Sequence, residues 1–194
     1  MKNIVVFASG SGSNFQAVIE AAESGEIECT ITGLITNNES AGAIEKAEEA
    51  GIPFRIMKPS EYRNPDEYAE ALSSQLDKWQ PDLIVLAGYL AKIPAPIIRR
   101  YPEKIINIHP SLLPKYGGKG YYGERVHKAV MEAGETQSGC TVHFVNEVYD
   151  DGPIIAQKKV DVYPGDTPKT LAGRILKEEH KLLPSVIQKI LNQQ

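Results

Sequence analysis

Apolar and polar positions divide the first two-thirds of the chain into two alternating kinds of segment. Short, nearly continuous apolar runs are typical of strands buried on both faces, and they lie at 3–8, 29–36, 53–57, 82–88 and 104–109. Between them, apolar residues recur at helical spacing, and these segments lie at 14–24, 41–51 and 66–79. Strands that alternate with helices predict an open α/β fold, with a mostly parallel sheet covered by helices on both faces.

The last third of the chain has a different pattern. Residues 138–148 alternate in the manner of a strand with two unlike faces, and 153–163 reads as a second strand after a turn. We therefore expect an antiparallel addition to the sheet near 138–163. Residues 168–193 predict a long C-terminal helix that Pro184 would kink or divide. The glycine-rich segment 116–126 predicts a mobile loop.

Length and charge restrict the classes of function. A chain of 194 residues can bury the core of one domain. The net charge is −4, and no run of Lys and Arg is longer than two, which argues against a nucleic-acid surface. The first apolar run breaks at Ser9, too early for a signal sequence or a membrane span, so we expect a cytoplasmic protein without a membrane partner. Cys29 and Cys140 form no CxxC pair, and we expect both to be reduced core residues.

The turn 8-ASGSGSNFQA-17 follows the first predicted strand. Gly10 and Gly12 match the first two glycines of the dinucleotide motif, but Phe15 stands at the third, where close packing needs glycine. A turn of small residues at a helix N-terminus suits one phosphate group, because free N–H groups and the helix dipole converge there. A plain strand-to-helix turn without a ligand remains the alternative.

A stronger chemical signal lies at 105-IINIHPSLLPKYGG-118. Asn107 and His109 are two residues apart at the carboxyl end of a predicted strand, so their side chains point the same way. Ligands of open α/β sheets bind at this end. Asn can donate to a developing oxyanion, and His can carry a proton near neutral pH. The alternative is a strand end whose histidine is only structural.

Asp150, in 149-YDDGP-153, is a candidate third group. A carboxylate near His109 would raise the pKa of the imidazole and fix the orientation of the ring. The alternative interpretation is a hairpin turn, because Asp-Gly, here Asp151 and Gly152, is a common turn pair.

These motifs together resemble the glycinamide ribonucleotide formyltransferases, a folate-dependent formyltransferase family, over nearly the whole chain. The segments that carry the resemblance are 105-IINIHPSLLPKY-116 and 138-SGCTVHFVNEVYDDGPIIAQ-157, supported by 7-FASGSGSNFQA-17, 85-VLAGYL-90 and 178-EEHKLLP-184. The resemblance implies one Rossmann-like formyltransferase domain, 1–194, with a nucleotide-phosphate half, 1–100, and a catalytic and folate-binding half, 101–194.

The resemblance also implies an activity: transfer of the formyl group of 10-formyltetrahydrofolate, the co-substrate, to the amine of 5′-phosphoribosylglycinamide (GAR) in purine biosynthesis. The implied catalytic residues are Asn107, His109 and Asp150. The implied nucleotide contacts are Gly12, Ser13 and Asn14 for the phosphate and Glu179 for the ribose. The implied folate contacts are Leu90, Ala91, Lys92, Ile93 and Asn107. We expect small-molecule partners only, no metal, and a monomer or homodimer.

Some positions depart from the family pattern. Many members carry Arg where this chain has Ala91, and Lys92 need not replace it. The segment 117–139 is longer than usual, and Arg63 is only a weak candidate for a contact with the folate tail. The remaining histidines lack the paired spacing of a metal site, and we expect them to be structural; they are His127, His143 and His180.

Three alternative functions remain. A formyltetrahydrofolate hydrolase shares the Asn, His and Asp set but carries an additional amino-terminal domain. Formylation of methionyl-tRNA uses a similar core with a further carboxyl-terminal domain and a basic surface. A non-catalytic nucleotide-binding module would explain the turn at Gly10–Asn14 but not the residues at 107, 109 and 150.

Overall fold

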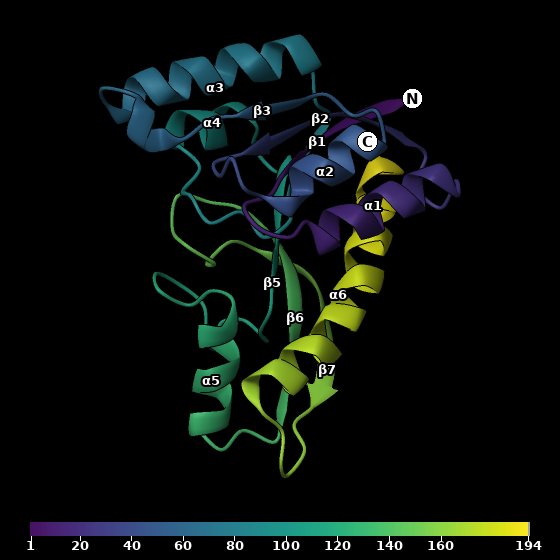
Figure 1. The fold of residues 1–194 in the computed structure, drawn as a ribbon, viewed down its shortest axis with the longest axis vertical. Helices are drawn as coiled ribbons and strands as arrows, with labels where there is room; N and C mark the ends of the chain where they lie inside the picture. The colour runs from purple at the N-terminus through teal and green to yellow at the C-terminus, as the bar shows by residue number, and fades with distance from the viewer. Residues whose placement is uncertain (194) are drawn as a thin grey trace.

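The computed structural model describes residues 1–193, and its centre is a seven-stranded sheet (Figure 1). The strands are β1 (Lys2–Phe7), β2 (Cys29–Thr36), β3 (Phe54–Ile56), β4 (Leu83–Leu86), β5 (Ile105–His109), β6 (Gln137–Phe144) and β7 (Ile154–Asp161). Their order is β3-β2-β1-β4-β5-β6-β7. The pairs from β3 to β5 are parallel, whereas β6 and β7 are antiparallel. This confirms the predicted fold class, including the antiparallel addition.

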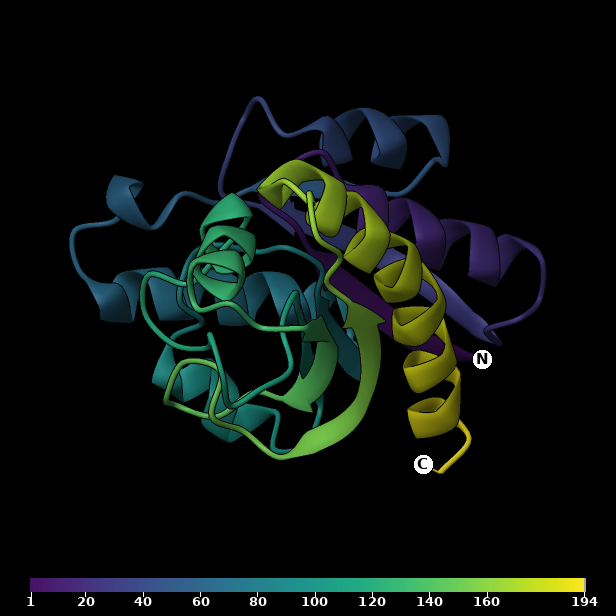
Figure 2. The same ribbon diagram turned by 90° about the horizontal axis from the view of Figure 1, so that it is seen from below.

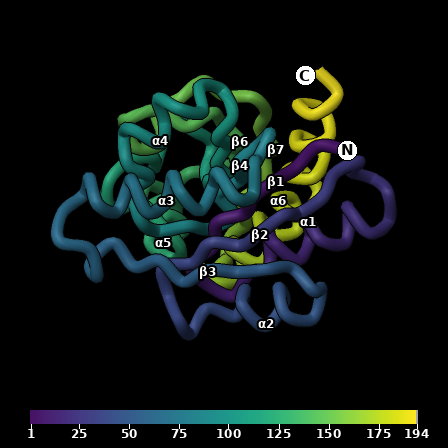
Figure 3. The backbone as a smooth tube through the Cα atoms, turned by 90° about the horizontal axis from the view of Figure 1, so that it is seen from above, coloured from purple at the N-terminus to yellow at the C-terminus, as the bar shows by residue number. Residues whose placement is uncertain are grey.

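Helices cover both faces of the sheet. They are α1 (Ser13–Glu23), α2 (Gly42–Glu49), α3 (Pro65–Trp79), α4 (Ala95–Arg100), α5 (Glu124–Glu132) and α6 (Pro168–Leu191), with a short 3₁₀ turn, η1 (Pro59–Glu61). One core cluster joins the sheet to α1, α2, α5 and α6, and a second joins the other face to α3 and α4. Figure 3 shows α3 and α4 on one side of β1, with α1 and α6 on the other.

Two helices, α5 and α4, were not predicted from the sequence. The segment 116–126 was predicted to be a loop, but α5 already begins at Glu124. Its buried aliphatic residues, Val126 and Val130, give too short a pattern to be recognised from the sequence. The six-residue helix α4 was not predicted either. Within residues 1–193, no helix is long and apolar enough to span a membrane.

Helix α6 is the longest element and runs beside β7 (Figure 2). Thr167 caps its N-terminus by accepting from the backbone N–H of Thr170, whose hydroxyl in turn accepts from the Thr167 N–H. The sequence predicted that Pro184 would kink or divide this helix, and the structure shows that the helix is not divided there. Leu183 and Ile187, on either side of this proline, are fully buried in the core. This packing holds the helix together where one backbone hydrogen bond is missing.

The strand order explains where a site can form. The chain leaves β1 towards β2 on one side and returns to β4 on the other, so the order reverses between β1 and β4. The loops that follow β1 and β4 run to opposite faces of the sheet, and a crevice opens beyond the carboxyl ends of the strands. Strand β5 pairs with β4 and ends at His109, beside this crevice.

Candidate active site

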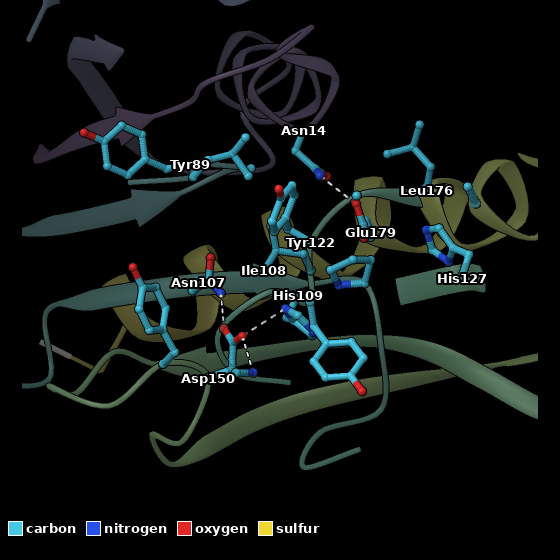
Figure 4. A pocket seen from close by; sticks show the side chains of 18 of the residues that line it. Asn14, Tyr89, Asn107, Ile108, His109, Tyr122, His127, Asp150, Leu176 and Glu179 are labelled. Carbon is cyan, nitrogen blue, oxygen red and sulfur yellow. Dashed lines mark hydrogen bonds and ion pairs between the residues drawn. The ribbon is translucent and has the colours of Figure 1, made fainter. Parts of the chain in front are cut away.

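Three polar side chains lie close together at the carboxyl end of β5 (Figure 4). Asn107, His109 and Asp150 all line one cavity of about 460 Å³. Asn107 and His109 project from the same face of β5, and the loop after β6 brings Asp150 to them. The structure therefore brings together the three residues for which the sequence suggested catalytic roles.

The amide of Asn107 lies between an imidazole and a carboxylate. His143 donates its Nδ1–H to the backbone oxygen of Phe144, 2.8 Å away, so its Nε2 is left as an acceptor. Asn107 donates one N–H to this Nε2 at 3.1 Å. Its other N–H points to Oδ1 of Asp150, and the distance of 3.4 Å makes this a long hydrogen bond. One N–H is thus held firmly, and the second is available to a ligand.

The imidazole of His109 also has a fixed orientation. Its Nε2 lies 2.8 Å from the backbone oxygen of Tyr116, which can only accept, so this nitrogen carries a proton. Its Nδ1 lies 3.5 Å from Oδ2 of Asp150. Burial lowers the pKa of His109, and the opposing effects of Asp150 and Tyr116 do not overcome it. Asp150 acts to raise the pKa of His109, as expected, but the ring is only 4% exposed and desolvation is the larger effect, so the net shift is downward.

Asp150 is held in an unusual backbone conformation. Its φ of 54° is in the left-handed region, which a non-glycine residue adopts only where its surroundings impose it. The backbone N–H of Gly118 donates to Oδ2 at 2.9 Å, and His143 lies 3.6 Å from Oδ1. Burial works to raise the pKa of Asp150, but the imidazoles of His143 and His109, when they carry a proton, and the N–H of Gly118 outweigh it and lower the pKa. Asp150 is therefore a carboxylate near neutral pH.

Two of the four nucleotide candidates, Asn14 and Glu179, also line this cavity, whereas Gly12 does not. Asn14 donates to Oε2 of Glu179 at 2.7 Å, which joins α1 to α6. Burial raises the pKa of Glu179, although the hydrogen bond from Asn14 opposes this effect. Gly12 precedes α1 at a φ of 74°, and no side chain caps the helix. A Cβ on Gly12 would lie 2.7 Å from the Cα of Ala43, so glycine is required there for space as well.

The structure separates some of the remaining candidates. Ser13 does not line the main cavity; it lines a neighbouring groove between α1, α2 and α6. Leu90 lines the main cavity, and it is 57% exposed at the rim. Arg63 pairs with Glu67 on the surface and lines neither the main cavity nor the folate-side cavity described next.

A second cavity, of about 70 Å³, adjoins the first, and we call it the folate-side cavity after the folate contacts that the family resemblance implies. Ala91, Lys92 and Ile93 line it, as expected for a shared pocket. Asn107 and Asp150 line both cavities and so stand where the two meet. Among residues 1–193, no arginine lines the folate-side cavity, and the Nζ atom of Lys92 lies 5.4 Å from the centre of the Tyr149 ring.

Sequence reasoning missed part of this site. His143 was expected to be structural, but it contacts both Asn107 and Asp150. The antiparallel pairing of β6 with β5 places His143 directly opposite Asn107. The alternating pattern of residues 138–148 predicted the face of the strand on which His143 lies. It did not predict which residue His143 contacts, because the register between neighbouring strands decides that contact. His127 was also expected to be structural, yet it lines the main cavity.

Across the described part of the chain, no group of three or more His, Cys, Asp or Glu side chains is arranged to hold a metal ion.

The fold and the site define an open α/β protein in which a buried His109 and the partly buried Asn107 and Asp150 gather beyond the carboxyl ends of the parallel strands. The chain belongs to the formyl transferase family, whose model matches residues 2–187. This confirms the family resemblance inferred from the motifs.

Individual relatives support the same family. The chain is 44% identical to a chloroplastic phosphoribosylglycinamide formyltransferase of Arabidopsis thaliana, over 96% of this chain and 64% of that protein. A glycinamide ribonucleotide transformylase 1 of Geobacillus kaustophilus has a TM-score of 0.92 at 38% identity, covering 98% of this chain and 99% of that one. A formyltetrahydrofolate deformylase of Pseudomonas syringae has a TM-score of 0.88 at 26% identity, covering 99% and 62%.

Proposed function

We propose that this protein transfers the formyl group of 10-formyltetrahydrofolate to the amine of GAR, giving formyl-GAR and tetrahydrofolate in purine biosynthesis. The observation that carries the proposal is the position of Asn107 and Asp150, which stand where the two cavities meet and lie beside His109. Two substrates can therefore meet at the three polar groups. The names of the Arabidopsis and Geobacillus relatives support this choice of substrates.

The two cavities suggest how the substrates are arranged. The phosphate of GAR would lie on the uncapped N-terminus of α1, on the backbone of Gly12, Ser13 and Asn14, where N–H groups are free. Glu179 would accept hydrogen bonds from the ribose hydroxyls. The folate would enter past Leu90, with its ring system in the folate-side cavity. The amine and the formyl group would then meet beside Asn107.

The chemistry of formyl transfer assigns a role to Asn107. The neutral amine attacks the formyl carbon, and the formyl oxygen becomes negative in the tetrahedral intermediate. The N–H of Asn107 that makes only a long hydrogen bond to Asp150 is available to this oxygen, while the bond to His143 fixes the orientation of the amide. One well-placed donor of this kind commonly contributes about 10²–10³ in rate.

Protons must also move during the reaction. The attacking nitrogen loses a proton, and N10 of the folate gains one as the C–N bond breaks. His109 is uncharged in the resting protein because burial lowers its pKa, so its Nδ1 can accept the proton. Asp150, at 3.5 Å from this atom, stabilises the imidazolium that forms. The proton then passes to N10, and the intermediate collapses to products.

A product assay tests the proposal. Purified protein is incubated with 10-formyltetrahydrofolate, with and without GAR, and mass spectrometry detects formyl-GAR and formate. We expect formyl-GAR only when GAR is present. Formate released equally in both samples would instead support hydrolysis, the activity in the name of the Pseudomonas relative. Binding of ligands without either product would contradict an enzymatic function.

A further inference from the structure

Among residues 1–193, two histidines line the main cavity, His109 and His127. The proposed chemistry gives a role to His109 but none to His127. It lies on α5 and is only 4% exposed. Its Nδ1 atom is buried and has no hydrogen-bond partner among the described residues. A buried polar atom without a partner costs free energy, so a helix that needed only to pack would place an apolar residue there. The cavity is where a partner could come from.

The position of His127 indicates which part of a ligand it would meet. Helix α5 packs on α6, which supplies Leu176 and Glu179 to the same cavity. Figure 4 shows His127 near these two residues, at the end of the cavity away from Tyr89 and Asn107. This is the nucleotide end, not the end where the folate would enter.

The charges of His127 and Glu179 indicate which chemical group of a ligand would bind at the nucleotide end of the cavity. Burial and the neighbouring His109 lower the pKa of His127 to about 4, so the ring is uncharged near neutral pH. A neutral imidazole has one donor and one acceptor nitrogen. Glu179, which Asn14 already contacts, offers acceptor oxygens nearby. A neutral ring and acceptor oxygens suit hydroxyl groups, whereas a phosphate dianion would meet no positive charge from either residue.

We propose that His127 binds a ribose hydroxyl of the acceptor nucleotide, together with Glu179. This inference rests on the proposed function and deepens it, because it adds a residue that selects the sugar. His127 is a binding residue in this assignment, and it takes no part in the proton transfer.

The test uses substitutions at His127 and a matched control on the same helix. His127→Phe keeps the ring size and removes both nitrogens, whereas His127→Asn places an amide where Nδ1 was. Val130→Ala, in the same helix and fully within the core, loosens α5 without touching the cavity. Each variant is assayed for the Michaelis constants of GAR and folate. Calorimetry measures the affinity for ribose 5-phosphate and for inorganic phosphate, which does not depend on turnover.

We expect His127→Phe to raise the Michaelis constant for GAR by about tenfold and to weaken the binding of ribose 5-phosphate by about the same factor. A tenfold change is the effect of losing one buried hydrogen bond. The folate constant and the affinity for inorganic phosphate should not change. His127→Asn should recover part of the loss, and Val130→Ala should lower thermal stability without a selective effect on GAR.

Unchanged affinity for ribose 5-phosphate in His127→Phe would overturn the inference while leaving the proposed function intact. An equal loss for ribose 5-phosphate and inorganic phosphate would also overturn it, because the contact would then be with the phosphate. Failure of the wild-type protein to formylate GAR is a separate result, and it would overturn the proposed function itself.

Discussion

At the scale of single residues, the site depends on a balance between burial and hydrogen-bond partners. His109 has an acceptor facing each ring nitrogen, namely the oxygen of Tyr116 and the carboxylate of Asp150. These partners favour the imidazolium, whereas burial favours the neutral ring and dominates. The histidine is therefore neutral at rest but close to groups that stabilise it once it is protonated. This is the behaviour required of a residue that takes a proton and returns it.

Replacing His109 tests this role directly. We expect His109→Ala to lower kcat by about 10²–10⁴, because the imidazole that takes the proton from the amine and returns it to N10 is lost. Binding of ribose 5-phosphate, measured by calorimetry, should stay close to the wild-type value. A variant within a few-fold of wild-type kcat would exclude His109 as the proton carrier.

Replacing Asp150 tests the pairing of the two residues. The carboxylate acts to raise the pKa of His109, so Asp150→Asn should lower that pKa further. The limb of the profile of kcat/KM against pH that reports His109 should move to lower pH, and an NMR titration of the His109 ring should move with it. Asp151→Asn is the matched control, because Asp151 is exposed and hydrogen-bonds only weakly, to Asn146 at 3.5 Å. Equal profiles for both variants would contradict the pairing.

At the scale of elements, strand pairing and one long helix assemble the site. The β5–β6 register places His143 opposite Asn107 and so determines which amide hydrogen is held. Helix α6 carries Glu179 to Asn14 of α1, 165 positions away in the sequence. The pattern of residues 168–193 predicted this helix, but not that it continues through Pro184, because packing on both sides of the proline decides that.

The N-terminal cap of α6 should contribute measurably to stability. Thr167→Ala removes the hydroxyl that accepts from the Thr170 N–H, and we expect it to lower the free energy of unfolding by about 1 kcal/mol. Urea unfolding at neutral pH measures this change. Turnover under native conditions should not change, because Thr167 lines neither cavity. An unchanged urea midpoint would mean that water replaces the cap without loss.

At the scale of the whole molecule, the buried histidines link stability to pH. The pKa of His127 is lowered from 6.5 to about 4 in the folded protein, so its contribution to stability is complete above about pH 6.5 and is lost as the pH falls towards 4. His109 and His180 also have lowered pKa values and act in the same direction. Glu179 acts in the opposite direction, because burial raises its pKa.

A comparison of variants isolates the contribution of His127. The free energy of unfolding should decrease between pH 7 and pH 5 in both the wild-type protein and His127→Gln. The decrease should be larger in the wild-type protein, by at most about 2 kcal/mol. Urea unfolding at the two pH values gives both slopes, and the contributions of the other groups cancel in the difference. Parallel slopes would mean that His127 is not desolvated in the folded protein.

The sequence by itself determined the layout of strands and helices, because continuous apolar runs and helical spacing are local patterns. It also placed Asn107 and His109 on one face, since alternation along a strand is local as well. The tertiary structure alone decided that His143 meets Asn107, that His127 faces the cavity, and that burial outweighs Asp150 at His109. Strand register, helix packing and desolvation depend on residues far apart in the chain, so no single segment contains them.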